Sequence, residues 1–252
     1  CREVAERIAD LPGSAPVVTF GFTKDCSVRA TNVRSALTLG SAALGRGSGN
    51  GTVFDCHDSS GQRRLHLRIP GRHNVANALA ALAVANVMDI DPIPVAEALS
   101  RFVGVDRRFQ DRGSVRGVQV IDDYAHHPTE VAATLAAARD QMGQGRLITV
   151  FQPHTYSRTQ RFHAEFALAL TEADDTWVTS VYAAREQPED GMQSHAIVHG
   201  LQAAGHTACW QQDVARALDA ALHSCVPGDW LVVMGAGDIG AQLDVLLQER
   251  GV

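Results

Sequence analysis

The 252-residue sequence is 45% hydrophobic and 20% charged, and its formal net charge is −6. These proportions are typical of a folded globular protein and exclude a disordered, collagen-like or coiled-coil chain. Because the net charge is negative and the basic residues are scattered, the composition also argues against a nucleic-acid-binding protein.

The first 70 residues predict a helix followed by short strands. The chain opens at Cys1, without a methionine, inside a helical pattern over residues 1–11, so we expect a piece of a longer polypeptide. Short alternating segments between Gly, Ser and Asn clusters are typical of hairpins, and they cover residues 17–22, 28–33, 52–57 and 63–70. The glycine- and serine-rich stretch over residues 40–51 predicts an exposed, flexible loop.

Two helices are predicted after Pro70 and Gly71. Residues 73–88 repeat alanine, leucine and valine at helical spacing on nearly all sides, which predicts a buried helix. A second helix over residues 95–104 is expected after the breaks at Pro92 and Pro94.

From residue 118 onward, short apolar runs alternate with amphipathic helices. This alternation predicts an α/β fold with a mostly parallel sheet that helices cover on both faces. Ligands of such sheets bind beyond the carboxyl ends of the strands, so polar residues at those positions are site candidates. They are Asp122, Asp123, Tyr124, His126 and His127 after one strand, and Gln152, His154, Tyr156 and Arg158 after the next.

The cellular compartment is predicted from the absence of membrane, signal and disulfide patterns in the sequence. No apolar run reaches the roughly 18–20 residues of a membrane helix, and the first ten residues are charged rather than signal-like. The five cysteines are odd in number and form no C-x-x-C pair, so neither a disulfide framework nor a zinc cluster is expected. We therefore expect a cytoplasmic protein.

The segment IDDYAHHPTE (121–130) brings two carboxylates and two imidazoles together. With His154, they would form the metal site of a hydrolase. Strand alternation points Asp122 and Asp123 to opposite faces, which argues against one shared ion. Some of these side chains would instead cap the helix that begins at Pro128. The pattern alone leaves both interpretations open.

Two arginine-containing segments suggest anion binding. In FQPHTYSRT, His154 and Arg158 lie four residues apart where a helix begins, and helix N–H groups together with a guanidinium suit a carboxylate or phosphate. A solvated surface arginine is the alternative. Arg107 and Arg108 lie on the connector between the two halves, where they either close over a nucleotide or form a solvated hinge.

Three further patterns concern nucleotides. GAGDIG (235–240) matches G-x-G-x-x-G, but too few residues follow for the acidic residue about 20 positions on, so we interpret it as a tight strand-to-helix turn. The single lysine, Lys24, lies outside any G-x-x-x-x-G-K-[ST] loop. At the start of the apolar helix, Asn74 fits an N-cap, whereas Asn77 has no simple structural role.

Taken in order and spacing, five segments resemble the Mur ligases: HNVANALAALAVA, GVDRRFQ, IDDYAHHPTEVAATLAAAR, VFQPHTYSRT and MGAGDIG. The resemblance runs from about residue 70 to the end of the chain. It implies a truncated central ATPase-type domain over residues 1–108, followed over 109–252 by a Rossmann-like C-terminal domain that receives an amino acid.

The pair DDYAHHPTE and FQPHTYSRT is similar to the family members that join L-alanine to UDP-N-acetylmuramate for peptidoglycan synthesis. The resemblance implies that ATP phosphorylates the muramyl carboxylate and that the amine of L-alanine attacks the acyl phosphate. The expected cofactors are ATP and Mg²⁺, and the expected partners are small molecules, with no nucleic acid or membrane span. The phosphate loop and magnesium ligands would lie upstream of Cys1, so this piece is expected to be inactive alone.

The resemblance also implies roles for individual residues. It assigns four residues to ATP: Asn74, Asn77, Arg108 and Asp123. It places four residues around L-alanine: Tyr124, His126, His154 and Arg158. Of these, it implies catalytic roles for His126, His154 and Arg158. Arg158 is expected to pair with the carboxylate of L-alanine, and no residue is expected to bind a metal. Thr155 stands where several relatives have arginine. The alternatives are the metal-dependent hydrolase and a non-catalytic nucleotide-binding module.

Overall fold

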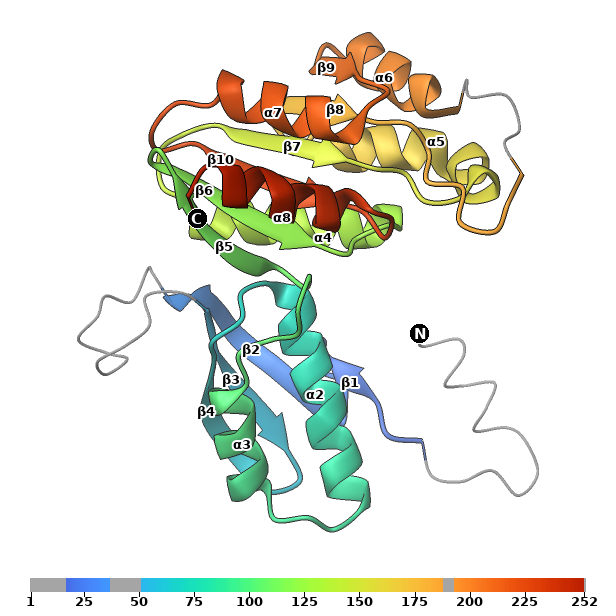
Figure 1. Cartoon of the computed structure of the whole chain (residues 1–252). Coiled ribbons are helices and arrows are strands. Elements are labelled where there is room, and N and C mark those ends of the chain that lie inside the picture. Colours follow the sequence, from blue (N-terminus) through green and yellow to red (C-terminus); the bar gives the residue numbers. More distant parts are fainter. Residues whose placement is uncertain (1–16, 37–50, 188–192, 252) are drawn as a thin grey trace. The chain divides into compact units, whose positions relative to one another are not determined.

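A computed structural model describes residues 17–36, 51–187 and 193–251 (Figure 1). The chain divides into two compact units, Cys1–Val103 and Gly104–Val252. The helix expected over residues 1–11 and nearly all of the loop expected over 40–51 lie outside the described residues. Because the division falls before the boundary predicted after residue 108, Arg107 and Arg108 belong to the second unit.

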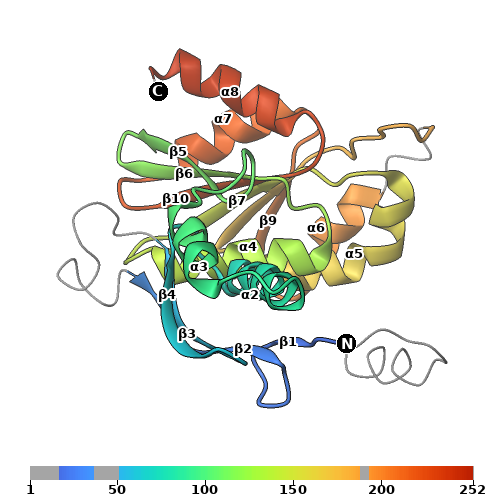
Figure 2. The ribbon, with the colours of Figure 1, turned by 90° about the horizontal axis from the view of Figure 1, so that it is seen from below.

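In its described residues, the first unit is a four-stranded sheet with two helices packed on one of its faces (Figure 2). Its elements are β1 (Phe20–Gly21), β2 (Val28–Ser35), β3 (Thr52–Asp58), β4 (Gly61–Leu67), α2 (Arg72–Val87) and α3 (Pro92–Arg101). The strands lie in the order β1-β2-β3-β4, with β1 parallel to β2 and the other pairs antiparallel. Each predicted segment contains a strand, but the first is limited to Phe20–Gly21 and pairs in parallel with β2, so the expected hairpin is wrong there and is confirmed for β3 and β4.

Helix α2 is buried along one face only. Leu79 and Leu82 are completely buried in the core of this unit, whereas Val84 and Val87 are 58% and 66% exposed. The prediction of a helix buried on nearly all sides is therefore wrong. Alanine and valine occur on both faces of α2, so the apolar pattern does not reveal which face packs against the sheet.

Helix α3 begins earlier than predicted. Asp91 caps it by accepting a hydrogen bond from the backbone N–H of Ile93, and Pro92 is its first residue. Pro92 and Pro94 thus lie inside the first turn rather than before it. Proline is tolerated there because the first N–H groups of a helix have no partner within the helix.

The second unit has three layers, with helices on both faces of a six-stranded sheet (Figures 1 and 2). Its elements are β5 (Gln110–Val115), β6 (Val118–Asp123), α4 (Pro128–Gln141), β7 (Leu147–Phe151), α5 (Tyr156–Leu170), β8 (Asp175–Val178), α6 (Gln193–Ala203), β9 (Thr207–Trp210), α7 (Val214–Ser224), β10 (Trp230–Met234) and α8 (Ile239–Glu249). The strand order is β5-β6-β10-β7-β8-β9, and every pair except β5–β6 is parallel. The predicted α/β architecture is confirmed.

Two hydrophobic cores hold these layers together. Helices α4, α5 and α6 cover one face of the sheet, and α7 and α8 cover the other (Figure 1). Because both faces are covered, the central strand β7 is apolar at nearly every position and completely buried. The antiparallel edge strand β5 was not predicted, because its sequence QDRGSV is mostly polar and exposed.

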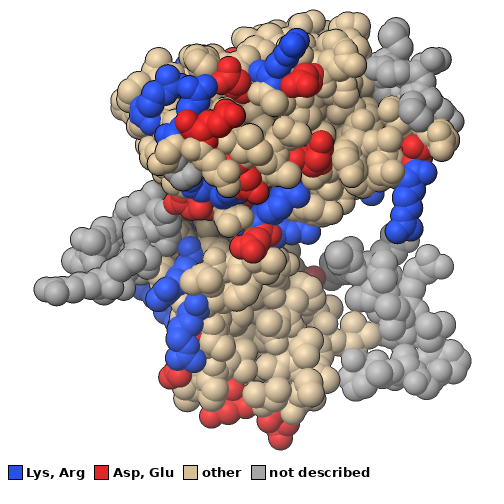
Figure 3. Space-filling model, viewed as in Figure 1, with Lys and Arg blue, Asp and Glu red and all other residues tan. Residues whose placement is uncertain are grey.

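The visible surface carries charges of both signs. Basic and acidic side chains are interspersed on the face of the second unit shown in Figure 3, consistent with 22 basic and 28 acidic residues in the sequence. In the part of the chain that the structure describes, no helix is long and apolar enough to cross a membrane.

The core assignment predicts different costs for two leucines on neighbouring helices. Leu135 on α4 is completely buried, whereas Leu168 on α5 is 73% exposed. We expect Leu135→Ala to lower the free energy of unfolding by about 2–5 kcal/mol. The matched control Leu168→Ala should change it by less than about 0.5 kcal/mol. Urea denaturation followed by circular dichroism measures both, and similar losses would contradict the assigned core.

Candidate functional site

The carboxyl ends of the central parallel strands lie at one edge of the second unit's sheet. The loop after β6 carries Tyr124 and His126, and the loop after β7 carries His154. Tyr182 follows β8, and the GAGDIG turn follows β10. As predicted, polar residues from separate strand ends therefore meet at this edge.

Four of the predicted residues form one contiguous cluster. The ring centroid of His126 lies 5.4 Å from that of Tyr124 and 5.8 Å from that of His154. The guanidinium Nη1 of Arg158 lies 3.4 Å from Nδ1 of His154. The cluster thus connects the end of β6 to the first turn of α5.

The hydrogen bonds of the two imidazoles indicate where their protons lie. Nδ1 of His126 is 2.9 Å from the carbonyl oxygen of Tyr124, which only accepts, so Nδ1 donates this hydrogen bond. Arg158 only donates, so Nδ1 of His154 accepts and Nε2 carries the proton. Burial, together with the charges of Arg158 and His126, lowers the pKa of His154. Nε2 of His154 therefore offers a ligand a donor, and Nε2 of His126 offers an acceptor when that ring is neutral.

Glu130, in the first turn of α4, holds His126 and Arg108 at the cluster. Its Oε2 accepts a hydrogen bond of 3.0 Å from the backbone N–H of His126 and lies 3.2 Å from Nδ1 of the ring. Its Oε1 is 3.9 Å from Arg108, whose guanidinium lies 5.3 Å from the centre of the Tyr124 ring. Sequence reasoning missed Glu130, although it lies three residues after the helix cap, which is the spacing of a capping box.

Asp123 fixes the backbone around the end of β6. Its side chain is 4% exposed, and its two oxygens accept hydrogen bonds of 2.7 Å from the backbone N–H groups of Phe109 and Ala125. Burial raises the pKa of Asp123 to about 6, against the lowering effect of these two hydrogen bonds. Asp123 therefore has a structural role whether or not it also binds a ligand.

Asp122 lies on the opposite face of the sheet from Asp123, as strand alternation predicts. Its carboxylate is completely buried and 3.4 Å from both Arg107 and Arg112. Arg107 also donates to the carbonyl oxygens of Gly235 and Gly237, at 2.7 and 3.4 Å. Neither predicted role fits Arg107, because it holds the GAGDIG turn and is neither a solvated hinge residue nor free to close over a nucleotide.

The aspartates and histidines do not gather into a metal site. Within the described ranges, no three His, Cys, Asp or Glu side chains lie close enough together to hold an ion. His127 is the N-cap of α4: its Nδ1 accepts a hydrogen bond of 3.3 Å from Thr129, and its ring packs against Phe162. The capping interpretation is confirmed for His127, and the hydrolase alternative lacks its ligand cluster in these ranges.

The N-terminus of α5, predicted to bind a carboxylate, already holds one from this chain. Glu186 accepts hydrogen bonds from the backbone N–H of Ser157 at 3.0 Å and from its hydroxyl at 2.5 Å. These hydrogen bonds lower the pKa of Glu186, which keeps it ionised. In the same segment, the Tyr182 ring stacks on His154 with 5.7 Å between centroids. Sequence reasoning missed Tyr182 and Glu186 because the segment after β8 contains no recognisable motif.

Thr155 begins α5 in an unusual backbone conformation. Its φ of 67° lies in the left-handed region, which a β-branched residue rarely adopts. Its N–H donates to the carbonyl of Tyr182 at 2.9 Å, and its carbonyl accepts from Thr159. Such strain persists only where surrounding contacts impose it, so the start of α5 is tightly constrained.

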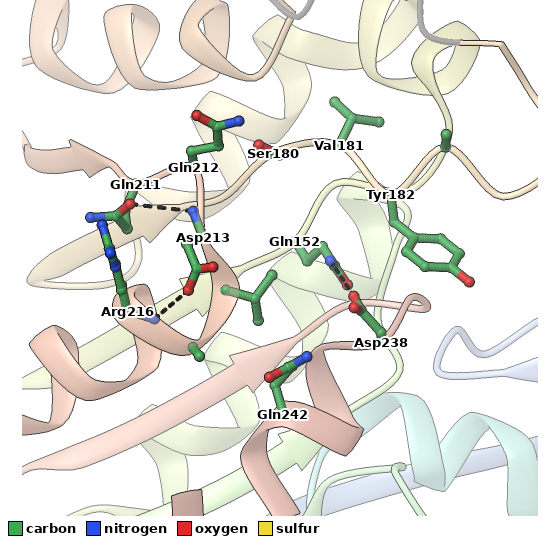
Figure 4. Close-up of a pocket in the computed structure, with 13 residues that line it drawn as sticks. Gln152, Ser180, Val181, Tyr182, Gln211, Gln212, Asp213, Arg216, Asp238 and Gln242 are labelled. Atoms are coloured by element: carbon green, nitrogen blue, oxygen red, sulfur yellow. Dashed lines mark hydrogen bonds between the residues drawn. The ribbon is translucent and has the colours of Figure 1, made fainter. Parts of the chain in front are cut away.

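GAGDIG forms the predicted tight turn between β10 and α8. Gln152, only 3% exposed, donates to Asp238 at 2.7 Å and accepts from the N–H of Ile239 at 3.2 Å. Figure 4 shows the first of these hydrogen bonds. A Cβ atom at Gly237 would overlap the side chains of Gln152 and Tyr182, so the close approach requires glycine.

A polar cavity of about 650 Å³ opens beside this turn (Figure 4). It lies where α7 and α8 begin, and its lining includes Ser180, Tyr182, Asp213 and Gln242. Asp213 caps α7 by accepting a hydrogen bond of 2.9 Å from the N–H of Arg216. Sequence reasoning did not find the cavity, because its walls come from four strand ends that are far apart in the chain.

The two asparagines assigned to ATP lie in the first unit, on the first two turns of α2. Asn74 donates to the carbonyl of Pro70 at 2.7 Å, and Asn77 donates to the side chain of Asn74 at 3.4 Å. The N-cap residue is Gly71, so the interpretation of Asn74 as an N-cap is wrong. Asn77 is exposed, which explains how an amide fits into this apolar helix.

Comparison with known proteins gives one family and several long matches. The profile of the family described as "Mur ligase, glutamate ligase domain" matches residues 107–237. The chain is 42% identical over 225 residues to UDP-N-acetylmuramate–L-alanine ligase of Salinibacter ruber, covering 88% of this chain and 45% of that protein. It is also 42% identical to the ligase of that name from Mycobacterium sp. (strain JLS), covering 96% and 51%. The chain thus spans about half the length of the curated relatives it matches.

Solved structures agree with this family. UDP-N-acetylmuramate-alanine ligase from Thermotoga maritima matches with a TM-score of 0.73 at 28% identity, over 93% of this chain and 48% of that one. A murein peptide ligase from Psychrobacter arcticus matches with a TM-score of 0.63 at 23% identity, over 92% and 46%. The second match supports the fold alone.

The environment of Asp123 predicts a pH dependence of stability. Its folded pKa of about 6 lies above the unfolded value near 3.9, so its stabilising contribution is complete below about pH 4 and is lost as the pH rises through 6. Between pH 4 and 7, the wild-type free energy of unfolding should therefore fall by up to about 3 kcal/mol more than that of Asp123→Asn. Urea denaturation across this range measures the difference.

Asp140→Asn serves as the control, because Asp140 is exposed on α4 and should leave the wild-type pH profile unchanged. Parallel pH profiles for the wild type and Asp123→Asn would contradict the raised pKa.

Proposed function

Because this chain belongs to the Mur ligase family, we propose that it takes part in joining L-alanine to UDP-N-acetylmuramate, with ATP converted to ADP and phosphate. The observation that carries the proposal is the cluster of Tyr124, His126, His154 and Arg158, which combines a carboxylate-binding cation with two imidazoles. Relatives that are 42% identical are named for this reaction. The product would serve peptidoglycan precursor synthesis, and an ATP-driven reaction of this kind is expected in the cytoplasm.

The proposed chemistry assigns a role to three side chains of the cluster: Arg158, His154 and His126. Arg158 pairs with the carboxylate of L-alanine, and the Nε2–H of His154 donates a further hydrogen bond to it. Nε2 of His126 accepts a proton from the ammonium group, which frees the lone pair of the amine. The amine nitrogen then attacks the carbonyl carbon of the acyl phosphate. A tetrahedral intermediate forms, and its carbon–oxygen bond breaks as phosphate leaves with the electron pair and takes up the second proton from the nitrogen, which leaves a neutral amide.

We assign ATP contacts to four residues: Asn74, Asn77, Arg108 and Asp123. Arg108 is half-exposed, so its guanidinium is available to phosphate oxygens. Asp123 would reach a ribose hydroxyl only through the lone pairs that its two backbone hydrogen bonds leave free. Mg²⁺ bound to ATP neutralises phosphate charge. The residues in the described ranges do not form a ligand set for this ion, so we derive no step through it.

The proposal is tested by phosphate release with ATP, Mg²⁺, UDP-N-acetylmuramate and L-alanine. We expect the full-length protein to release phosphate only when both the sugar nucleotide and L-alanine are present. The 252-residue chain alone should release none, since its sequence contains no G-x-x-x-x-G-K-[ST] loop. Release that does not depend on L-alanine would contradict the ligase. ATP binding without any turnover would favour a non-catalytic nucleotide-binding module.

The role of Arg158 predicts a selective kinetic defect. Arg158→Ala should raise KM for L-alanine about 10- to 100-fold, because a hydrogen-bonded charge pair is lost. KM for ATP should stay within about twofold, because the guanidinium is assigned to the amino acid. Arg161→Ala, which removes an exposed arginine on the same helix, is the matched control. Equal losses for both substrates would contradict the assignment.

A further inference from the structure

Glu186 places a fixed negative charge at the first turn of α5, the turn that also carries the arginine assigned to the substrate carboxylate. Both of its oxygens are hydrogen-bonded to Ser157, the residue that precedes Arg158. Its charge also interacts with His154, whose Nδ1 lies 3.4 Å from Arg158. Glu186, His154 and Arg158 therefore form one electrostatic group at the start of α5.

The segment that carries Glu186 is fixed at further points. The N–H of Tyr182 donates to the carbonyl of Pro153 at 2.8 Å, and the N–H of Thr155 donates to the carbonyl of Tyr182 at 2.9 Å. These two hydrogen bonds form a parallel bridge between His154 and Tyr182, whose rings also stack. The carboxylate of Glu186 is therefore held in place relative to α5.

A carboxylate at this position acts differently on two kinds of ligand. A simple carboxylic acid carries only a negative charge, so Arg158 attracts it while Glu186 repels it. The zwitterion of an amino acid adds an ammonium group, which Glu186 attracts. For unit charges several ångströms apart near a protein surface, this difference is on the order of tenfold in affinity.

We propose that Glu186 is a specificity-determining residue that makes the site select amino-acid zwitterions over carboxylic acids without an amino group. The inference rests on the proposed function, because it requires the carboxylate of the amino acid to bind Arg158. Selection matters for the chemistry, since an acid without an amine would occupy Arg158 and form no amide bond.

Propionate is the probe, because it is L-alanine with the amino group replaced by hydrogen. The quantity compared is the ratio of the competitive Ki for propionate to KM for L-alanine. Both constants are measured by phosphate release from the full-length protein. We expect Glu186→Gln to lower this ratio about tenfold, because the side chain keeps its shape but loses its charge. Glu186→Asp keeps the charge and should retain the wild-type ratio within about threefold. Glu165→Gln, which removes an exposed charge on α5, should match the wild type.

Ser157→Ala separates the charge of Glu186 from its hydrogen bond. It removes the hydroxyl contact but keeps the carboxylate, so the ratio should stay within about twofold of wild type. Thermal melting confirms that each variant is folded. The proposal is overturned by a Glu186→Gln variant that changes Ki and KM by the same factor, or by equal effects of Ser157→Ala and Glu186→Gln. A wild type without L-alanine-dependent release overturns the proposed function and this inference together. An active wild type with an unchanged ratio in Glu186→Gln overturns the inference alone.

Discussion

The insertion of β10 between β6 and β7 is the constraint on which the candidate site depends. Met234, the last residue of β10, pairs in register with Asp123 on one side and Phe151 on the other. The ladder continues one step further, because Gly235 donates to the carbonyl of Asp123 and Gln152 donates to that of Met234. The loops after β6, β7 and β10 therefore start at the same edge of the sheet. This brings His126 of the β6 loop and His154 of the β7 loop into ring contact.

Crowding polar groups at one sheet edge is costly unless each is hydrogen-bonded, and this divides the edge into two sets of residues. Two residues of the buried set have their side chains engaged within the fold: Asp123 on two backbone N–H groups and Gln152 on the GAGDIG turn. The more exposed set, which includes His126, Arg108 and Arg158, keeps donors or acceptors for a ligand. Proximity to the strand ends alone therefore does not identify a ligand-binding residue.

The sequence predicted the architecture of the second unit because a parallel sheet buried on both faces requires apolar strands between amphipathic helices. It missed β5, whose polar sequence lies at the sheet edge, and it misjudged how much of α2 is buried. Pairing across the edge was harder to predict. His154 and Arg158 are four residues apart in one segment and could be paired from the sequence, whereas Glu186 and Ser157 are 29 residues apart and meet only through the bridge between the β7 and β8 loops.

The start of α5 differs from a general anion site because a carboxylate of the chain already occupies one of its N–H groups. Free N–H groups at a helix N-terminus attract any anion, because the helix dipole does not distinguish one carboxylate from another. Here Glu186 occupies the N–H of Ser157, so attraction for a ligand carboxylate passes to the side chain of Arg158, which His154 contacts. The hydrogen bonds to Tyr182 hold Thr155 in its strained left-handed backbone conformation and so fix the start of α5. If Glu186 has the role proposed above, selectivity follows from two opposite charges held at the start of α5, Arg158 on the helix and Glu186 on the segment after β8, and the dipole supplies only the background.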